Sequence, residues 1–373
     1  MMLRGVRLLL RTPACLSETP ALGNEVFSSG YIPGSTVRGA LAGCYLASGR
    51  SAESEEFRRF FGPGGVRFSN FYLDISRPLS LSAFTCKRFP GFRNDTSALL
   101  APPHGVVDLL FEADSNANER RCEHEQCGHA LVDHELRFYT GPAHDLKSHP
   151  TSRALRMRTS VTQSGAPREG ALFVQSEIPA GEQFQGTLAS DDGRAAELIK
   201  LFNGRIAGFI GKRRSGKADF DFDSFNRPVE TPELHAWQSK EKRWAAMTFA
   251  SDAILIDRLL RPITCIDNQT LHCALGLPTA ITVEVENSFA TWRKVAGWSG
   301  VGKMFKPDDI AISMGSTALL HFKDGDEDEI TQWMQGLAQN GAGLRREEGF
   351  GQITFSAPLH MAMFENQQPG IAL

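Results

Sequence analysis

The first apolar pattern in the chain has a period of two. Val6, Leu8 and Leu10 alternate with residues of mixed character up to position 11. Because successive side chains of a β-strand point to opposite faces, this alternation predicts a strand that begins the fold. The apolar run is short and is interrupted by Arg7, so it does not fit the core of a targeting peptide.

Residues 31–40, with the sequence YIPGSTVRGA, predict the end of a strand, a tight turn and the start of a helix. Pro33 and Gly34 end the extended run. We expect Ser35 to cap the helix, because its hydroxyl can accept a hydrogen bond from a free amide of the first turn. Arg38 leaves from the helix N-terminus, where free amides favour an anion, so it is a candidate phosphate contact. The alternative is a solvated arginine on a capped helix.

One succession of elements occurs twice: a helix, a glycine stop, a glycine-framed loop with two consecutive arginines, and a strand. The first helix ends at Gly204 and is followed by the loop GKRRSGK at residues 211–217. The second begins in an acidic run, ends at Gly341 and is followed by the loop GLRREEGFG at residues 343–351. This recurrence predicts two diverged copies of a split βαβ, ferredoxin-like unit.

We therefore predict an α+β fold with two ferredoxin-like (RRM-like) units in tandem. The first unit is expected to span residues 1–228 and to contain an insertion at about 76–150, where regular periodicity disappears. Pro228, Pro232 and several charges cluster at the start of an expected linker, which spans residues 229–244. The second unit then spans residues 245–373, with its first strand at residues 253–256.

Composition narrows the classes of function. The net charge of the 373-residue chain is −3, so any nucleic-acid site must be a local patch. One such patch is the stretch from 147 to 168, which has five lysines or arginines and no acidic residue. The seven cysteines are odd in number and scattered, which predicts a reducing cytoplasm rather than a secreted disulfide framework. No stretch is long enough to span a membrane.

The cysteines of the expected insertion predict a metal site. Cys122 and Cys127 form a C-x4-C pair, a spacing seen at structural zinc sites, and Cys86 is a third candidate thiolate. Four histidines compete for the fourth position: His104, which we favour, then His129, and also His124 and His134. Thiolates with an imidazole suit tetrahedral zinc without an open position, so the ion is expected to be structural. Free cysteines in a loop are the alternative.

The loop at residues 211–217 has the spacing of a phosphate-binding P-loop, but two features exclude that function. The next residue is Ala218, so no hydroxyl is available for magnesium, and a strand-like alternation follows where a P-loop requires a helix. We interpret it as a loop whose amides and cations bind a nucleic-acid backbone. A solvated hairpin is the alternative.

Three aromatic residues of the second unit lie among cations. They are Trp292, Trp298 and Phe305, and the cations are Arg293, Lys294, Lys303 and Lys306. Aromatic rings between cations suit base stacking beside phosphates. They also suit an ordinary loop packed on the sheet, and the sequence leaves both interpretations open.

The sequence offers little for catalysis. It has no nucleophile elbow, no HExxH and no paired-aspartate metal motif. His321 and His360 lie in apolar runs and are expected to be core histidines. Asp257 follows a strand-like run and is expected to cap a turn.

Taken in order, these motifs resemble the RAMP superfamily of CRISPR–Cas ribonucleoprotein effectors, and most of all the large type III-D RAMP subunit, a relative of the subunit that binds the crRNA 5′ end. The matches are YIPGSTVRGA at residues 31–40, Cys86 with HGVVD at 104–108 and the Cys122/Cys127 pair, RTS at 158–160 leading to GALF at 170–173, and the loop ending in GFG at 349–351.

The resemblance implies a non-catalytic subunit that binds the repeat-derived 5′ tag of crRNA. Its expected protein partners are the large polymerase-like subunit and the backbone RAMP subunits, and it is expected to meet target RNA only indirectly. The expected RNA contacts are Arg38, Arg156, Arg158, Lys212, Arg213, Arg214, Lys217, Arg345 and Arg346. Two alternatives remain: a crRNA-processing endoribonuclease of RAMP type, or a pure protein–protein scaffold.

Overall fold

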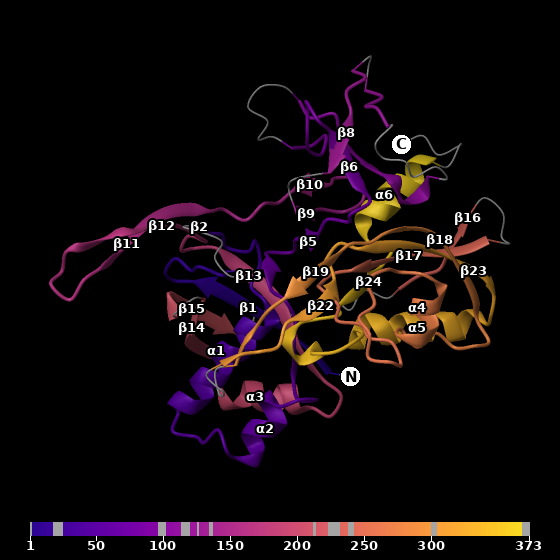
Figure 1. The fold of residues 1–373 in the computed structure, drawn as a ribbon. Coiled ribbons are helices and arrows are strands. Elements are labelled where there is room, and N and C mark those ends of the chain that lie inside the picture. The colour runs from indigo at the N-terminus through magenta and orange to yellow at the C-terminus, as the bar shows by residue number, and fades with distance from the viewer. Residues whose placement is uncertain are drawn as a thin grey trace.

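The computed structural model describes residues 2–17, 25–95, 102–112, 120–124, 127–133, 137–211, 214–222, 232–237, 242–299 and 304–367. In these residues the chain forms two antiparallel sheets, each with its own helices and its own hydrophobic core (Figure 1). A third, smaller body of short strands lies beside the C-terminal helix. No helix in the described part of the chain is long and apolar enough to cross a membrane.

The first sheet has the topology of a ferredoxin-like unit. Its elements are β1 (Met2–Leu10), α1 (Gly34–Ala47), α2 (Glu55–Phe61), β3 (Arg67–Phe68), β4 (Tyr72–Leu73), β13 (Gln183–Ser190), α3 (Arg194–Leu201), β14 (Arg205–Ile210) and β15 (Gly216–Asp221). The strand order is β14-β15-β1-β13-β3, and β4 also pairs with β13. The two central strands, β1 and β13, come from different βαβ halves, so the two halves interleave in the sheet.

The predicted first strand is confirmed as a central strand of this sheet. Val6 and Leu8 of β1 are fully buried and pack in one core with Phe184 of β13. Opposite Val6 lies Gly186, where a Cβ atom would come within 2.0 Å of the Phe71 ring. Only glycine leaves room there for the aromatic ring to cover the sheet.

The helix predicted within residues 31–40 is α1, but its first turn differs from the expectation. It begins at Gly34, one residue before Ser35, and no side chain of its N-cap residue accepts a hydrogen bond. The Gly34 N–H donates instead to Oδ1 of Asn70 at 2.9 Å. The prediction that Ser35 caps the helix is therefore wrong, because the segment beside β3 supplies the acceptor oxygen.

The second sheet repeats the same topology. Its elements are β16 (His235–Trp237), β17 (Lys242–Phe249), α4 (Asn268–Cys273), β18 (Thr282–Phe289), β23 (Thr317–Asp324), α5 (Glu327–Asn340) and β24 (Ile353–Phe355). The order is β16-β17-β23-β18, and β24 pairs with β17. The tandem ferredoxin-like fold predicted from the repeat is thus present. The acidic run opens α5, where Asp326 accepts hydrogen bonds from two backbone amides of the first turn.

The expected first strand of the second unit was placed wrongly. The strand that begins the sheet is β17, whereas residues 253–256 form only isolated bridges, such as Ala253 with Ile312 and Ile254 with Leu344. Ala253 and Ile254 are buried, so this apolar run is a buried connecting segment and not a strand of the sheet. Residues 229–244, expected as a linker, include β16 and the first residues of β17.

The residues of the expected insertion form two small sheets. One contains β5 (Arg77–Pro78), β9 (Phe138–Thr140) and β10 (Lys147–Ser148), and the other β6 (Ala83–Cys86), β7 (Val106–Asp108) and β8 (Leu131–Asp133). Although it interrupts the first unit, this insertion packs on the C-terminal helix α6 (Pro358–Gln367). His360 of α6 is 1% exposed, as expected of a core histidine, and its Nδ1 lies 2.5 Å from Oδ2 of Asp108.

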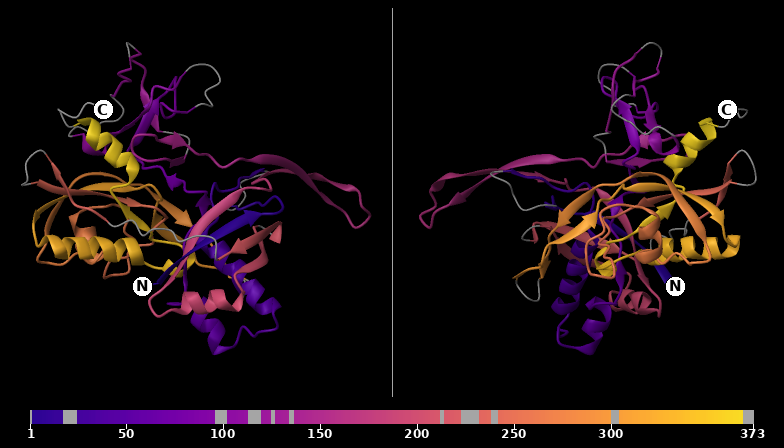
Figure 2. Two further views of the ribbon diagram at one scale, coloured as in Figure 1. Left: turned by 180° about the vertical axis from the view of Figure 1, so that it is seen from behind. Right: turned by 45° about the vertical axis from the view of Figure 1, so that its right-hand side comes forward.

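Two hairpins extend from this framework. β11 (Ala154–Val161) and β12 (Pro167–Glu177) form an arm that projects far from the rest of the molecule (Figure 2). At its base β12 pairs in parallel with β2 (Glu25–Val26). The other hairpin is formed by β19 (Trp292–Val295) and β22 (Asp309–Ile312), continued by β20 (Trp298–Ser299) and β21 (Met304–Phe305). It extends from the second unit toward the first (Figure 1).

Candidate functional site

Four side chains of the insertion come together in one cluster. The ligand atoms of Cys86, His104, Cys122 and Cys127 all lie within 4.8 Å of one another. Sγ of Cys86 is 3.7 Å from Sγ of Cys127, and Nδ1 of His104 is 3.3 Å from Sγ of Cys122. Tetrahedral Zn–S bonds of about 2.3 Å place two sulfurs about 3.8 Å apart, so these separations fit. The four residues expected as ligands are brought together and can hold a metal ion.

A tight backbone loop orients two of these thiols. The Cys127 N–H donates to the carbonyl of His124 at 2.8 Å, and the Gly128 N–H donates to the carbonyl of Cys122 at 3.2 Å. Gly128 has a φ of 60°, in the left-handed region that glycine adopts without a Cβ penalty. The loop thereby turns Cys122 and Cys127 toward Cys86 at the end of β6.

Two of the competing histidines lie next to the cluster. Nδ1 of His129 is 3.1 Å from Sγ of Cys127, and the His124 ring stacks on His104 with centroids 4.1 Å apart. Neither belongs to the group of four whose ligand atoms converge. His134 lies outside the described residues.

The thiols differ in acidity for identifiable reasons. Burial acts to raise the pKa of Cys86, but hydrogen bonds from the amides of Phe89 and Arg88 outweigh it, and this pKa falls below its ordinary value. Burial is also the main effect at Cys122, where it raises the pKa to about 11. The thiol of Cys86 is therefore more acidic than that of an ordinary cysteine, and the thiol of Cys122 is less acidic.

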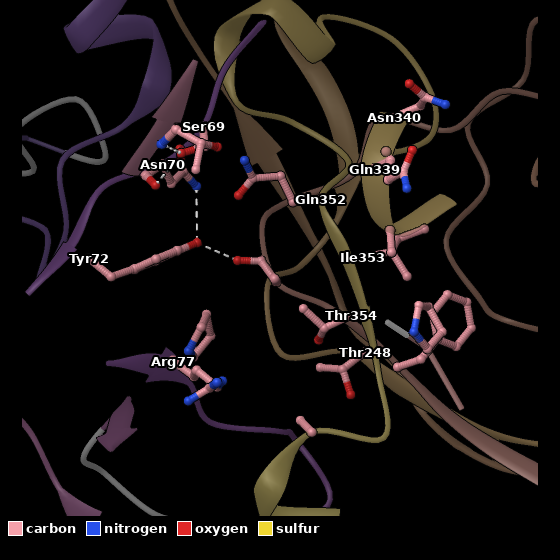
Figure 3. Close-up of a pocket in the computed structure, with 18 of the residues that line it drawn as sticks. Ser69, Asn70, Tyr72, Arg77, Thr248, Gln339, Asn340, Gln352, Ile353 and Thr354 are labelled. Carbon is pink, nitrogen blue, oxygen red and sulfur yellow. Dashed lines mark hydrogen bonds between the residues drawn. The ribbon is translucent and has the colours of Figure 1, made fainter. Parts of the chain in front are cut away.

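A second site is a cleft of about 190 Å³ between the two ferredoxin-like units (Figure 3). In Figure 3, Asn70, Tyr72 and Arg77 lie on one side of it, and Gln339, Asn340, Gln352 and Thr354 lie on the other. The first wall comes from the segment around β3 and β4, and the second from β24 and the end of α5. The tandem arrangement itself therefore creates the cleft.

The charge of the cleft is one-sided. Among the described residues, Arg67, Arg77 and Arg346 line it and no aspartate or glutamate does. Arg67 donates to Oδ1 of Asn340 at 3.2 Å, so its guanidinium connects the two walls, and it also meets Asp191 at 2.9 Å. Arg346 is exposed at the rim. A concave surface lined by cations without carboxylates concentrates positive potential and favours phosphate groups.

Two of the expected RNA contacts, Arg38 and Arg345, lie where the two units meet. We call this region, the cluster of cations around Glu348, the joint. Glu348 is 5% exposed, and three cations surround it: Arg38 at 3.6 Å, Arg345 at 2.8 Å and Lys306. Arg345 also binds Asp309 at 2.8 Å. Burial acts to raise the pKa of Glu348, but hydrogen bonds from Lys306 and Arg345 outweigh it and lower this pKa below its ordinary value.

Arg156 and Arg158 lie on the arm. Their guanidinium groups reach the buried Glu177 at 3.5 and 2.7 Å while their side chains stay 58% and 40% exposed. The alternating positions of the same strand carry Leu155 and Met157, each 73% exposed. The arm therefore presents a basic face and an apolar face.

The first glycine-framed loop is described only in part. Arg214 and Lys217 are exposed, and the Arg214 N–H donates to the carbonyl of Gly211 at 3.0 Å. Lys212 and Arg213 lie outside the described residues.

The residues examined for catalysis have structural surroundings. Asp257 caps a turn as predicted, since its Oδ1 accepts hydrogen bonds from the amides of Leu259 and Arg261 at 2.8 and 2.9 Å. His321 faces Glu286 at 3.1 Å on the second sheet.

Sequence reasoning missed Arg67 and Arg77 as members of a cation-lined cleft. Arg67 lies in a two-residue strand and Arg77 begins the insertion, so no local pattern distinguishes them from solvated arginines. Their convergence with Arg346 depends on how the two units pack, which no local signal in the sequence reports.

No family model and no curated protein matches the chain. Among solved structures, a chain of the type III-B Cmr-beta complex bound to cognate target RNA is similar over 91% of this chain and 96% of its own length, with 12% identity and a TM-score of 0.44. A CRISPR-associated protein Cas6 is similar over 95% and 99%, with 9% identity and a TM-score of 0.32. A Thermus thermophilus Cas6 is similar over 49% and 75%, with 13% identity and a TM-score of 0.29.

Proposed function

We propose that this chain is an RNA-binding RAMP subunit of a type III CRISPR effector complex, related to the large type III-D RAMP subunit. Its RNA ligand is the repeat-derived 5′ tag of crRNA. Its protein partners are the large polymerase-like subunit and the backbone RAMP subunits, and it meets target RNA through the complex. The order of the sequence motifs supports this proposal, together with the tandem ferredoxin-like fold.

The observation that carries the RNA-binding role is the cleft between the units. Three arginines line it without a carboxylate, and amide and hydroxyl groups from Asn70, Gln352 and other residues complete its walls. Cations bind the RNA backbone whatever its sequence, and amides can read base edges or hydroxyls. We place the RNA backbone in this cleft, in contact with Arg67, Arg77 and Arg346.

The other expected RNA contacts take different parts in the proposal. The exposed residues Arg156 and Arg158 on the arm, Arg214 before β15 and Lys217 within β15 extend the basic surface. For Lys212 and Arg213, which lie outside the described residues, the sequence alone supports a role as RNA contacts. Arg38 and Arg345 pair with Glu348 in the joint beside the cleft, and the sequence motifs support their role as RNA contacts.

The metal of the four-residue cluster is proposed to be zinc with a structural role. Three thiolates and one imidazole suit zinc, and a site with four protein ligands leaves no open position for a substrate. The ion would fix the loop around Cys122 and Cys127 to β6, and so stabilise the insertion that packs on α6.

Fluorescence anisotropy with a labelled crRNA that carries its 5′ tag tests the cleft. The double variant Arg77→Ala, Arg346→Ala should bind more weakly, and the slope of log affinity against log salt should decrease by about 0.7 for each lost phosphate contact. Arg261→Ala is the matched control, because Arg261 is exposed and pairs with Asp257 outside the cleft. Equal affinities of the two variants would remove the cleft from the proposal.

The same preparation separates the alternatives. Metal-independent cleavage of repeat RNA by the purified chain would replace the proposal with the endoribonuclease. A chain that assembles with its partners but crosslinks to no RNA would be a protein scaffold.

A further inference from the structure

The hairpin formed by β19 and β22 has two unlike faces. Val295 is buried and packs in a small cluster with Ile254, Ala311 and the ring of Phe350, a residue that also lines the cleft. On the alternating positions, Trp292 and Trp298 each leave 56% of their surface in solvent. Both indole rings are thus more than half exposed, although the hairpin also packs on the protein through Val295.

The end of the described hairpin carries a pair of exposed rings. Trp298 and Phe305 occupy opposite positions of the β20–β21 ladder, and their centroids lie 5.1 Å apart with the planes at 83°. Phe305 is 73% exposed and the neighbouring Met304 62%. Each ring holds the other in place, so the pair is a preformed surface onto which a planar group can stack without much loss of side-chain freedom.

Cations lie near the rings, and each described one also meets a carboxylate: Arg293 meets Asp252, Lys294 meets Asp308 and Lys306 meets Glu348. Residues 287–307 include four cations and no acidic residue. Lys294, on the same face as the two tryptophans, leaves 67% of its side chain exposed while its Nζ reaches Asp308 at 2.6 Å. Rings that alternate with cations along one strand match alternating bases and phosphates of an unpaired RNA strand.

The hairpin is also joined to the cleft. Its buried face contacts Phe350, whose ring lies 4.7 Å from the Arg345 guanidinium, and Arg346 at the rim of the cleft is the next residue. Five residues separate the two tryptophans, and the six steps between them span at most about 20 Å. The hairpin that carries the rings therefore packs against a residue that lines the cleft.

We propose that Trp298 and Phe305, with Trp292 and Lys294 behind them, form a stacking platform for unpaired bases of the RNA whose backbone enters the cleft. The inference rests on the proposed RNA-binding function and adds the element that contacts bases. Base stacking on an aromatic ring does not depend on which base is present, so the platform binds single strands with little sequence preference.

The test compares Trp298→Ala with Trp298→Phe by fluorescence anisotropy, using labelled single-stranded polyuridine and crRNA. Trp298→Ala should weaken binding by about 5- to 150-fold, the range for removal of one stacked ring, and Trp298→Phe should restore most of it. Phe209→Ala is the matched control, since Phe209 is a 56% exposed aromatic residue on β14 of the other unit. Unchanged affinity of Trp298→Ala would overturn the platform.

Salt dependence keeps this test apart from that of the cleft. Loss of a stacked ring should lower the affinity by the same factor at low and high salt, whereas loss of a cleft arginine should change the slope. If the wild-type chain binds RNA and Trp298→Ala binds equally well, the platform fails and the cleft stands. If the wild-type chain binds no RNA, both fail.

Tryptophan fluorescence gives an independent readout. Of the five tryptophans, Trp244 and Trp333 are buried, so RNA stacked on the hairpin should quench Trp292 and Trp298, and the Trp298→Phe variant separates this signal from that of Trp237. Quenching by polyuridine should decrease in Trp298→Phe. A Trp298→Ala chain that keeps its RNA affinity but no longer co-purifies with its partner subunits would assign the rings to a protein interface and overturn the proposal.

Discussion

Arg38 of α1 and Glu348 of the C-terminal glycine-rich loop meet across the joint between the two ferredoxin-like units, with Nη1 3.6 Å from Oε1. Beside them the backbones of two glycines touch: a Cβ atom on Gly34 would lie 2.9 Å from Cα of Gly349. The two motifs that the sequence presents as separate loops are therefore packed against each other, and they form one side of the region that contains the cleft.

Glu348→Ala should destabilise the protein strongly. The substitution leaves Arg38, Arg345 and Lys306 clustered around a missing carboxylate, and breaking a buried ion pair from one side costs about 3–5 kcal/mol. Thermal unfolding measures the change. Glu284→Ala is the control, since it breaks an exposed pair with Lys323 that contributes at most about 1 kcal/mol. Equal losses would contradict a central role for the joint.

The stability from Glu348 should depend on pH. Because its pKa is lowered on folding, its contribution is present above the pKa of an unfolded glutamate and is lost as pH falls through the lower, folded value. The difference in unfolding free energy between wild type and Glu348→Gln should therefore be largest near neutral pH and shrink in acid. A difference that stays constant across the acid range would show that the carboxylate is not the group that matters.

Gly34→Ala and Gly39→Ala should have opposite effects on stability, although both glycines belong to α1. A Cβ atom at position 34 would lie 2.2 Å from the Phe68 carbonyl and 2.8 Å from the Glu348 carbonyl, and backbone cannot yield cheaply. At position 39 no neighbouring atom lies within 4 Å, so alanine should stabilise the helix by about 0.5–1 kcal/mol. Chemical denaturation measures both. A neutral Gly34→Ala would mean that the two loops do not pack this closely.

The purified chain should contain zinc, and Cys122→Ser should lose it. Elemental analysis checks the metal content, and the same variant should unfold at lower temperature because metal binding contributes to folding. Cys273→Ser is the control, since Cys273 is exposed and lies outside the cluster. A metal-free wild-type chain with the same melting temperature as Cys122→Ser would refute the zinc site.

The fold could be predicted because its signals are local. The alternation of Val6, Leu8 and Leu10 and the glycine that ends α5, Gly341, are each visible within a few residues. The end of α3 is predicted less well, because this helix ends at Leu201 and not at Gly204. The metal set could be predicted because thiols at a short spacing are rare and have few other uses. By contrast, the strand β17 includes two alanines and was missed, while the more apolar residues 253–256 were mistaken for it.

The cleft could not be predicted, because its arginines come from three separate segments and converge only when the units pack. The contacts of Arg38 and Arg345 with Glu348 could not be predicted either, because they also depend on how the units pack. Their sequence context resembles that of phosphate contacts, yet Glu348 lies between them in the folded chain. No local pattern in the sequence indicates that Trp298 is exposed, because an aromatic residue among cations is compatible with either face of a hairpin.

Native purification with the neighbouring genes co-expressed, followed by extraction and sequencing of the bound RNA, tests the central claim most directly. We expect RNAs that share one repeat-derived 5′ tag, and crosslinks from that tag to this subunit at the cleft between its two units. A clean complex in which this chain crosslinks to no RNA would contradict the account and leave a RAMP-like fold with a role in protein assembly.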